Sequence, residues 1–372
     1  MRRQALLLSG SLGAGHEMHA RACATSLAGR GWDTGTLDAM QLLGPRGGSA
    51  GEAVFRTMLA TPGLYDAFHF AALRPGGRLA MLADAGARRQ LVPRLRDYLD
   101  AHPADLAVSV FATAASAVSV LADRYPAMSH VVLCSDVTPH RLWVQPNVDL
   151  YLVTSTVAEA AVRRYQPRAR VRVVESPVRP GFYDPPAQEQ ARAGLGLPVD
   201  DRAVLLMSGA WGLGPIAAAA AALADAGVQV LAVAGRNVKL ENRLRAAARQ
   251  RPRLHVFGYT EEIPALMAAA DLVITSSGDT CSEARVVGRP LLLLDLVPGH
   301  GRDNLQHELE LGAWVTSARP AAVVRNALAA ADRVKPAAEG LGPPPAAAQH
   351  RAAWESSFST LLAALGLDDR FR

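Results

Sequence analysis

Residues 271–304 contain the groups that could hold a nucleotide diphosphate. The apolar run at 272–274 predicts a short buried strand, the small residues at 275–280 predict a turn, and the segment that follows favours a helix. Free backbone N–H groups and the dipole at such a helix start suit a phosphate or pyrophosphate. Glu283, one helical turn further along, could accept hydrogen bonds from both hydroxyls of a ribose. The stretch therefore predicts a nucleotide-diphosphate pocket.

His16 is the candidate base near the start of the chain. It follows a predicted strand at 4–9 and a glycine-rich turn, and it stands where a helix is predicted to begin. The dipole there disfavours a protonated imidazole and keeps a neutral base available, although the ring could equally well only cap the helix. The pairing with His19 is not the HExxH of a zinc peptidase, and a nicotinamide site is not supported, because GxGxxG is not matched by the glycines at 10, 13 and 15.

Asp136 and His140 form a second polar group. Both follow a predicted strand at 130–134. Open α/β sheets bind ligands beyond the carboxyl ends of their strands, so these two side chains are further candidates for a ligand site.

The elements that position these residues alternate between strand and helix in two series. Apolar runs predict strands at 4–9, 34–37, 106–111, 130–134, 149–153 and 171–174, and, after a Pro- and Gly-containing linker at 175–181, at 203–207, 228–233, 254–257, 272–274 and 291–294. A glycine loop at 208–214 leads into the first helix of the second series, and a short amphipathic helix is predicted at 352–365. At 372 residues the chain fits two α/β domains with doubly wound sheets.

Composition excludes several classes of protein. The three cysteines form no CxxC pair, which argues against a disulfide framework or a zinc site and favours a reducing cytoplasm. The uncharged stretches at 106–122 and 203–224 each begin as a strand and become Ala-rich helix, so we expect buried strand–turn–helix units and not membrane spans. The N-terminus shows no signal-peptide pattern.

Positive charge is concentrated in residues 45–96, which hold eight arginines against three acidic residues. The segment is either a solvated helix face or a surface attracted to an anionic membrane, because aromatic and apolar residues accompany its arginines. It lacks a recognisable nucleic-acid reader motif, so we expect no nucleic-acid partner.

Several motifs together resemble the monogalactosyldiacylglycerol synthase family. In chain order they are GAGH at 13–16, the segment 55–65 with its PGLY, SDVTPHRLWVQPNVDLYLV at 135–153, SPVRP at 176–180, MSGAWGLG at 207–214, AGRN at 234–237, GYTEEIPALMAAADLVITSSGDTCSEA at 258–284 and PGHGRDN at 298–304. The family includes processive diacylglycerol glucosyltransferases and is related to the enzyme that adds N-acetylglucosamine to lipid I.

The resemblance implies a GT-B fold, in which two Rossmann-like doubly wound domains face each other across a cleft. The acceptor-binding domain would span 1–176 and the UDP-sugar-binding domain 177–349. A C-terminal helix at 350–372 would return toward the first domain.

The resemblance also implies a role for each candidate residue. His16 would be the general base that takes the acceptor hydroxyl proton, while Asp136 and His140 would orient that base or the acceptor. Glu283 would hold the uridine ribose, and Tyr259 the uracil ring. The full set of expected UDP-sugar-binding residues is Gly209, Trp211, Gly212, Arg236, Asn237, Tyr259, Gly278, Asp279, Thr280, Glu283, His300 and Asn304.

Two positions depart from the pattern of the family. His300 replaces the usual glutamine, which contacts hydroxyl groups of the donor sugar. The phosphate turn at 275–280 lacks the usual double glycine.

The expected activity is inverting, metal-independent transfer of a hexose or N-acetylhexosamine from a UDP-sugar to a lipid or another hydrophobic hydroxyl acceptor. No Asp-x-Asp occurs in the chain, so a metal-dependent GT-A arrangement has no support, and neither a metal nor a cofactor is expected. A soluble tailoring glycosyltransferase of a secondary metabolite, a UDP-sugar 2-epimerase of the same fold and a non-catalytic nucleotide-binding regulator remain as alternatives. We expect a cytoplasmic protein, peripheral on the inner face of the cell membrane if residues 45–96 bind lipid.

Overall fold

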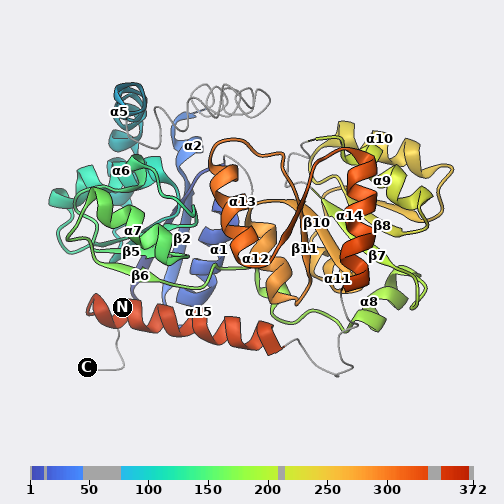
Figure 1. Cartoon of the computed structure of the whole chain (residues 1–372). Coiled ribbons are helices and arrows are strands. Elements are labelled where there is room, and N and C mark those ends of the chain that lie inside the picture. Colours follow the sequence, from blue (N-terminus) through green and yellow to red (C-terminus); the bar gives the residue numbers. More distant parts are fainter. Residues whose placement is uncertain (1, 12–14, 45–76, 208–213, 334–344, 368–372) are drawn as a thin grey trace. The chain divides into compact units, whose positions relative to one another are not determined.

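The structure is a computed structural model that describes residues 2–11, 15–44, 77–207, 214–333 and 345–367 (Figure 1). Its contacts divide the chain into two units. The first unit comprises Met1–Val178, Pro298–His300 and Ala352–Arg372, and the second comprises Arg179–Val297 and Gly301–Arg351. Each unit is built on its own sheet of six strands.

The first unit alternates strands and helices around a parallel sheet. Its strands are β1 (Gln4–Ser9), β2 (Asp33–Asp38), β3 (Leu106–Ser109), β4 (Ser129–Cys134), β5 (Leu150–Val153) and β6 (Val171–Val173). Its helices are α1 (Gly15–Ala28), α2 (Ala39–Leu42), α5 (Arg78–Ala101), α6 (Ala112–Leu121), α7 (Thr156–Tyr165) and most of α15 (Pro345–Ala364), with 3-10 turns η2 (Ala122–Arg124) and η3 (Arg141–Trp143). The strand order is β2-β1-β3-β4-β5-β6, so β1 lies between β2 and β3, where the order of the sheet reverses.

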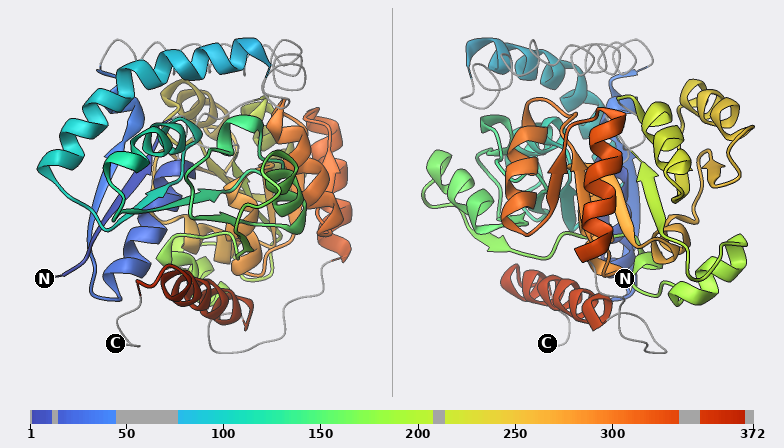
Figure 2. Two further views of the ribbon diagram at one scale, coloured as in Figure 1. Left: turned by 90° about the vertical axis from the view of Figure 1, so that its left-hand side faces the viewer. Right: turned by 45° about the vertical axis from the view of Figure 1, so that its right-hand side comes forward.

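Both faces of the sheet are buried at its four central strands, β1, β3, β4 and β5, which explains why these strands are largely apolar runs. On β1, Ala5 and Leu7 pack in a cluster with α1 and α15, while Leu6 and Leu8 pack with α5 and α6. Figures 1 and 2 show α15 (red) beside α1 (blue), with α5 and α6 on the other side of the sheet.

Helix α15 is attached to α1 by a buried aromatic pair and by polar contacts. Trp354 and Phe358 are 2% and 0% exposed. The Trp354 indole N–H donates to Ser26 Oγ at 2.9 Å. Arg30 donates to the Glu355 carboxylate at 2.5 Å and to its backbone oxygen at 2.6 Å. These contacts join residues more than 320 positions apart in the sequence.

The second unit repeats the architecture. It contains η4 (Pro180–Phe182), α8 (Gln188–Leu195), β7 (Ala203–Met207), α9 (Ile216–Asp225), β8 (Gln229–Val233), α10 (Val238–Ala248), β9 (Leu254–Phe257), α11 (Ile263–Ala269), β10 (Leu272–Ser276), α12 (Asp279–Val286), β11 (Leu291–Leu294), α13 (His300–Glu310), β12 (Trp314–Thr316) and α14 (Pro320–Arg333). The parallel strand order is β12-β11-β10-β7-β8-β9, so the order reverses between β7 and β10.

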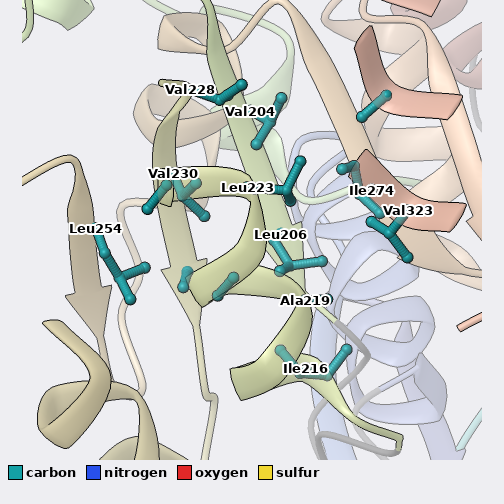
Figure 3. Close-up of a cluster of buried hydrophobic side chains, with 14 of the residues drawn as sticks. Val204, Leu206, Ile216, Ala219, Leu223, Val228, Val230, Leu254, Ile274 and Val323 are labelled. Atoms are coloured by element: carbon teal, nitrogen blue, oxygen red, sulfur yellow. The ribbon is translucent and has the colours of Figure 1, made fainter. Parts of the chain in front are cut away.

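One face of the second sheet packs against α9, α10 and α14. The cluster includes Val204 and Leu206 from β7, Leu223 from α9, Ile274 from β10 and Val323 from α14, all at most 3% exposed (Figure 3). Ala-rich helix surfaces let α9 and α14 approach the sheet closely.

The predicted strands are confirmed to within two residues at each end. The uncharged stretch at 106–122 forms β3 and α6, as predicted, and the stretch at 203–224 supplies β7 and α9. The prediction missed β12, and the last helix begins at Pro345, earlier than predicted. Most of the arginine-rich segment, 45–76, lies outside the described residues. Among the helices of the described ranges, none is both long and apolar enough to cross a bilayer.

Candidate active site

His16 lies at the switch point of the first sheet. It is the second residue of α1, the helix that follows β1, and its Nδ1 lies 2.7 Å from the backbone oxygen of Val110, which directly follows β3. This hydrogen bond therefore joins the segments that follow β1 and β3, the two strands between which the strand order reverses. Ligands of open α/β sheets bind at such a point.

The contact with Val110 fixes the tautomer of the His16 ring. A backbone carbonyl only accepts hydrogen bonds, so Nδ1 carries the hydrogen. In the neutral ring, Nε2 then keeps the lone pair that a general base needs. The half-buried ring also packs edge-on against Phe111, with the ring centroids 5.2 Å apart.

The close approach of these loops requires a glycine at position 10. A Cβ atom built there would lie 2.6 Å from the ring of Phe111, well inside contact distance. Gly10 thus lets the Phe111 ring approach the backbone after β1, where the ring also packs against His16.

Trp143 brings the other candidates of this unit together. Its buried ring centroid lies 6.3 Å from that of His16 and 6.2 Å from that of His140. The indole Nε1 donates to Asp136 Oδ2 at 2.7 Å. The structure therefore gathers His16, Asp136 and His140 around one indole. Sequence reasoning did not select Trp143, although its place in the 135–153 motif, among the two polar candidates, was a usable signal.

The other described candidates follow β8, β9, β10 and β11, on the turns after these strands or on α12 and α13. The four parallel strands all end at the carboxyl edge of the second sheet. After β8 and β9, the Arg236 guanidinium lies 4.8 Å from the centroid of the Tyr259 ring. Tyr259 is 58% exposed, and its hydroxyl donates to Glu261 at 2.6 Å. A planar cation above an exposed ring forms a flat surface on which a base could stack.

Gly278 directly precedes α12 and is its N-cap residue. Asp279 and Thr280 form the first turn of α12, and the backbone at Gly278 is extended. The neighbouring Ser277 hydroxyl donates to the Gly301 backbone oxygen at 2.8 Å and so ties this turn to α13. His300 and Asn304 are both residues of α13. The dipole of a helix places partial positive charge at its start, which favours an anion.

Glu283 is held by an arginine that sequence reasoning did not select. The carboxylate is on the buried side of α12, 5% exposed, and accepts from Arg179 Nε at 3.1 Å. Arg179 also lies 3.8 Å from Glu261 and stacks on Phe182, with 4.9 Å between the guanidinium carbon and the ring centroid. Arg179 belongs to the SPVRP motif, which sequence reasoning placed in the linker and among the family motifs without giving the arginine a role.

The remaining predicted donor-site residues divide into two groups. Gly209, Trp211 and Gly212 lie outside the described residues. Asn237 caps α10, where its side-chain oxygen accepts from the Leu240 N–H at 3.0 Å. Gly214, which directly follows the undescribed residues 208–213, has a φ of +86°. A Cβ there would lie 2.7 Å from Leu296, so only glycine fits.

Two family models match the chain, one in each half. Residues 79–178 match monogalactosyldiacylglycerol (MGDG) synthase, and residues 215–311 match the glycosyltransferase family 28 C-terminal domain. The first match includes Asp136, His140 and Trp143. The second includes Arg236, Tyr259 and Glu283.

Curated relatives agree with these matches. The chain is 34% identical over 195 residues to a probable monogalactosyldiacylglycerol synthase, chloroplastic, of Glycine max, covering 49% of this chain and 37% of that protein. It is 31% identical over 186 residues to a processive diacylglycerol beta-glucosyltransferase of Bacillus pumilus, covering 49% of each. The matches thus span less than half the length of these relatives.

The fold has solved counterparts along its whole length. Arabidopsis thaliana UGT89C1 complexed with UDP matches with a TM-score of 0.61 at 15% identity, covering 98% of this chain and 99% of that one. The predicted GT-B class is confirmed as two Rossmann-like parallel-sheet domains. On the GT-B fold, the chain thus contains a region that matches monogalactosyldiacylglycerol synthase and a second region that matches the glycosyltransferase family 28 C-terminal domain.

Proposed function

We propose that the protein is a glycosyltransferase that moves a hexose or N-acetylhexosamine from a UDP-sugar to the hydroxyl of a diacylglycerol-type lipid. The transfer would invert the anomeric carbon and need no metal ion. The observation that carries the proposal is the hydrogen bond from His16 Nδ1 to Val110, which leaves Nε2 as the basic atom at the switch point of the first sheet.

In the proposed reaction, His16 Nε2 takes the proton of the acceptor hydroxyl while the hydroxyl oxygen bonds to the anomeric carbon of the sugar. The bond from that carbon to UDP breaks, and UDP leaves with the electron pair. Because the acceptor attacks from the side opposite to UDP, a single displacement inverts the configuration.

The second unit supplies the groups that would bind UDP. The first N–H groups of α12 would stabilise the charge that develops on the leaving phosphate, a role that a metal ion has in other transferases. Glu283 would accept hydrogen bonds from the ribose, and Arg179 keeps that carboxylate in place from the other side. The Tyr259 ring would contact the uracil.

The acceptor class rests on the relatives. The proteins of Glycine max and Bacillus pumilus are named for a product or a substrate based on diacylglycerol. The MGDG synthase match falls on the half of the chain that carries His16, Asp136 and His140.

The test combines turnover with nucleotide binding. UDP-galactose, UDP-glucose and UDP-N-acetylglucosamine are offered with diacylglycerol, in EDTA, to the wild type and to His16→Ala and Glu283→Ala. Turnover should persist in EDTA. His16→Ala should lower it by about 100-fold or more while UDP affinity, measured by calorimetry, stays near wild type. Glu283→Ala should mainly weaken UDP binding.

Three results would contradict the proposal. Full turnover by His16→Ala would remove this residue from the mechanism. Consumption of UDP-N-acetylglucosamine without any acceptor would support the epimerase. Transfer to soluble hydroxyl compounds, with none to diacylglycerol, would support the tailoring enzyme.

A further inference from the structure

An arginine-lined hollow lies at the edge of the first sheet opposite to His16. Its volume is about 340 Å³, and it is lined by Leu150, Arg163, Ala169, Arg170, Val171, Arg172 and Ala364. Leu150 and Val171 begin β5 and β6. The hollow is therefore at the amino ends of the strands, whereas His16 and Asp136 follow carboxyl ends, so it is separate from the proposed active site.

The sequence concentrates positive charge at this edge. Residues 163–172 contain five arginines and no acidic residue, and three of the five line the hollow. The fold explains the grouping, because α7 returns the chain to the amino edge of the sheet. Arginines are present in the last turn of α7, in the connection after it and in β6.

Two of the three lining arginines are held in place by hydrogen bonds. Arg170 Nη2 donates to the backbone oxygen of Ala364, at the end of α15, at 3.0 Å. Arg163 Nη2 lies 2.8 Å from Glu159, one turn earlier on α7. Guanidinium groups fixed in this way lose little conformational freedom when they bind an anion.

The walls of the hollow combine this charge with apolar surface. The other four lining residues are apolar, and among the residues that the structure describes no acidic side chain lines the hollow. Glu159 offsets one of the three lining charges, which leaves a net surplus of two. Such a volume is in the range of small-ligand pockets and exceeds what a bare phosphate ion needs.

We propose that this hollow binds a phosphate group carried on a small organic residue, such as a glycerol phosphate. The arginine guanidinium groups would form paired hydrogen bonds with the phosphate oxygens, for which their planar fork is suited. The organic residue would contact Leu150 and Ala169. The same chemistry occurs in a soluble phosphate ester and in the headgroup of an anionic lipid.

The test uses two double variants with the same change in net charge. Arg170→Gln/Arg172→Gln removes two lining arginines. Arg164→Gln/Arg168→Gln removes two exposed arginines of the same ten-residue segment that do not line the hollow. Binding of glycerol 3-phosphate and of inorganic phosphate to the full chain is measured by calorimetry. Both variants retain any anion site elsewhere in the chain. The difference between them therefore reports on the hollow and does not depend on the proposed transferase activity.

The lining variant should bind glycerol 3-phosphate at least about tenfold more weakly than wild type, since each lost contact is a charge-assisted hydrogen bond. The control variant should stay within about twofold of wild type. Glycerol 3-phosphate should bind more tightly than inorganic phosphate. Arg172→Gln alone, which leaves the Arg170 contact with α15 intact, should show the same direction of change if the double variant proves unstable.

Vesicles distinguish the two sources of the phosphate. Phosphatidylcholine vesicles, with and without phosphatidic acid, are sedimented with the same variants. A loss of binding confined to the lining variant and to phosphatidic acid vesicles identifies a lipid headgroup, whereas binding of the soluble ester alone identifies a free ligand. Equal losses in both double variants would overturn the proposal. So would a wild type that binds neither glycerol 3-phosphate nor phosphatidic acid vesicles.

Discussion

At the scale of single residues, the first unit is organised around an indole that carries no charge. Trp143 contacts both candidate histidines and donates a hydrogen bond to Asp136. The hydrogen bond fixes the carboxylate, while the ring limits the positions that the imidazoles can take. We therefore expect Trp143 to act as a positioning residue for the proposed base.

This role predicts a loss of turnover in Trp143→Phe, which keeps an aromatic ring but removes the N–H donor. A hydrogen bond to a charged group contributes about 1.5–3 kcal/mol, so kcat/KM should fall by about tenfold or more. UDP affinity should not change. Trp314→Phe, in β12 of the second unit, is the matched control and should keep wild-type kinetics; a Trp143→Phe enzyme with wild-type kinetics would exclude the role.

The pair of Arg179 and Glu283 predicts energetic coupling in the second unit. Their side chains are 26% and 6% exposed, so each single substitution leaves a partly or fully buried charge without this partner. Urea unfolding of Arg179→Gln, Glu283→Gln and the double variant should give a coupling free energy of about 1–3 kcal/mol. Strictly additive losses would mean that the contact contributes nothing to stability.

His130 predicts a pH dependence of stability. Its ring is buried between β3 and β4, where Nε2 lies 3.0 Å from Ser109 Oγ, and burial lowers its pKa from 6.5 to about 4. The unfolded chain therefore binds a proton that the folded chain does not bind between those values. The resulting contribution to stability is complete above pH 6.5 and is lost as the pH falls toward 4.

His130→Gln should remove this part of the pH dependence. Between pH 6.5 and 5, wild type should lose about 2 kcal/mol more than the variant, at about 1.4 kcal/mol per pH unit. Urea unfolding at both pH values measures the difference. Equal losses in the two proteins would show that His130 titrates in the folded protein as it does in the unfolded chain.

At the scale of helices and strands, the sequence was sufficient wherever burial imposes a pattern. Strands such as β1 and β11 are buried on both faces, so their apolar runs predict them directly. In contrast, β12 has three residues at the edge of its sheet, with Val315 43% exposed, and it carries no such pattern.

The candidate site shows the same division. His16 and Asp136 could be selected from residue type and from their place after a strand. For Trp143 the only signal was its place in the 135–153 motif, and the roles of both Trp143 and Arg179 depend on tertiary contacts. The contact from Arg179 to Glu283, for example, spans 104 positions in the sequence.

Helix α15 offers a test of how far one element supports the first unit. Trp354 is 2% exposed in the cluster that it shares with α1 and β1, whereas the side chains of Arg30 and Glu355 are 19% and 39% exposed. Trp354→Ala should cost about 3–5 kcal/mol of stability, since it opens a cavity in this core. Glu355→Gln should cost less than about 1 kcal/mol, because solvent screens the pair. A Trp354→Ala variant within about 1 kcal/mol of wild type in urea would show that α15 packs only loosely.

At the scale of the whole molecule, the first unit separates its chemistry by sheet edge. The proposed base lies at the carboxyl edge, and the arginine-lined hollow lies at the amino edge. A third feature is on α5, whose first turns expose Met81 and Leu82 at 54% and 68%, one helical turn from Arg78. Apolar side chains beside arginines are typical of helices that lie on an anionic bilayer.

The exposed apolar side chains of α5 predict that this helix binds the lipid surface. Met81→Ser/Leu82→Ser should reduce sedimentation with anionic vesicles and raise the KM for diacylglycerol presented in them, because both side chains would insert between headgroups. Turnover of the best soluble acceptor should not change. Val120→Ser/Val157→Ser, which replaces two valines that are 51% and 48% exposed elsewhere in the first unit, is the matched control. If both double variants bind vesicles as the wild type does, α5 is a solvated face, and the lipid must reach His16 by another surface.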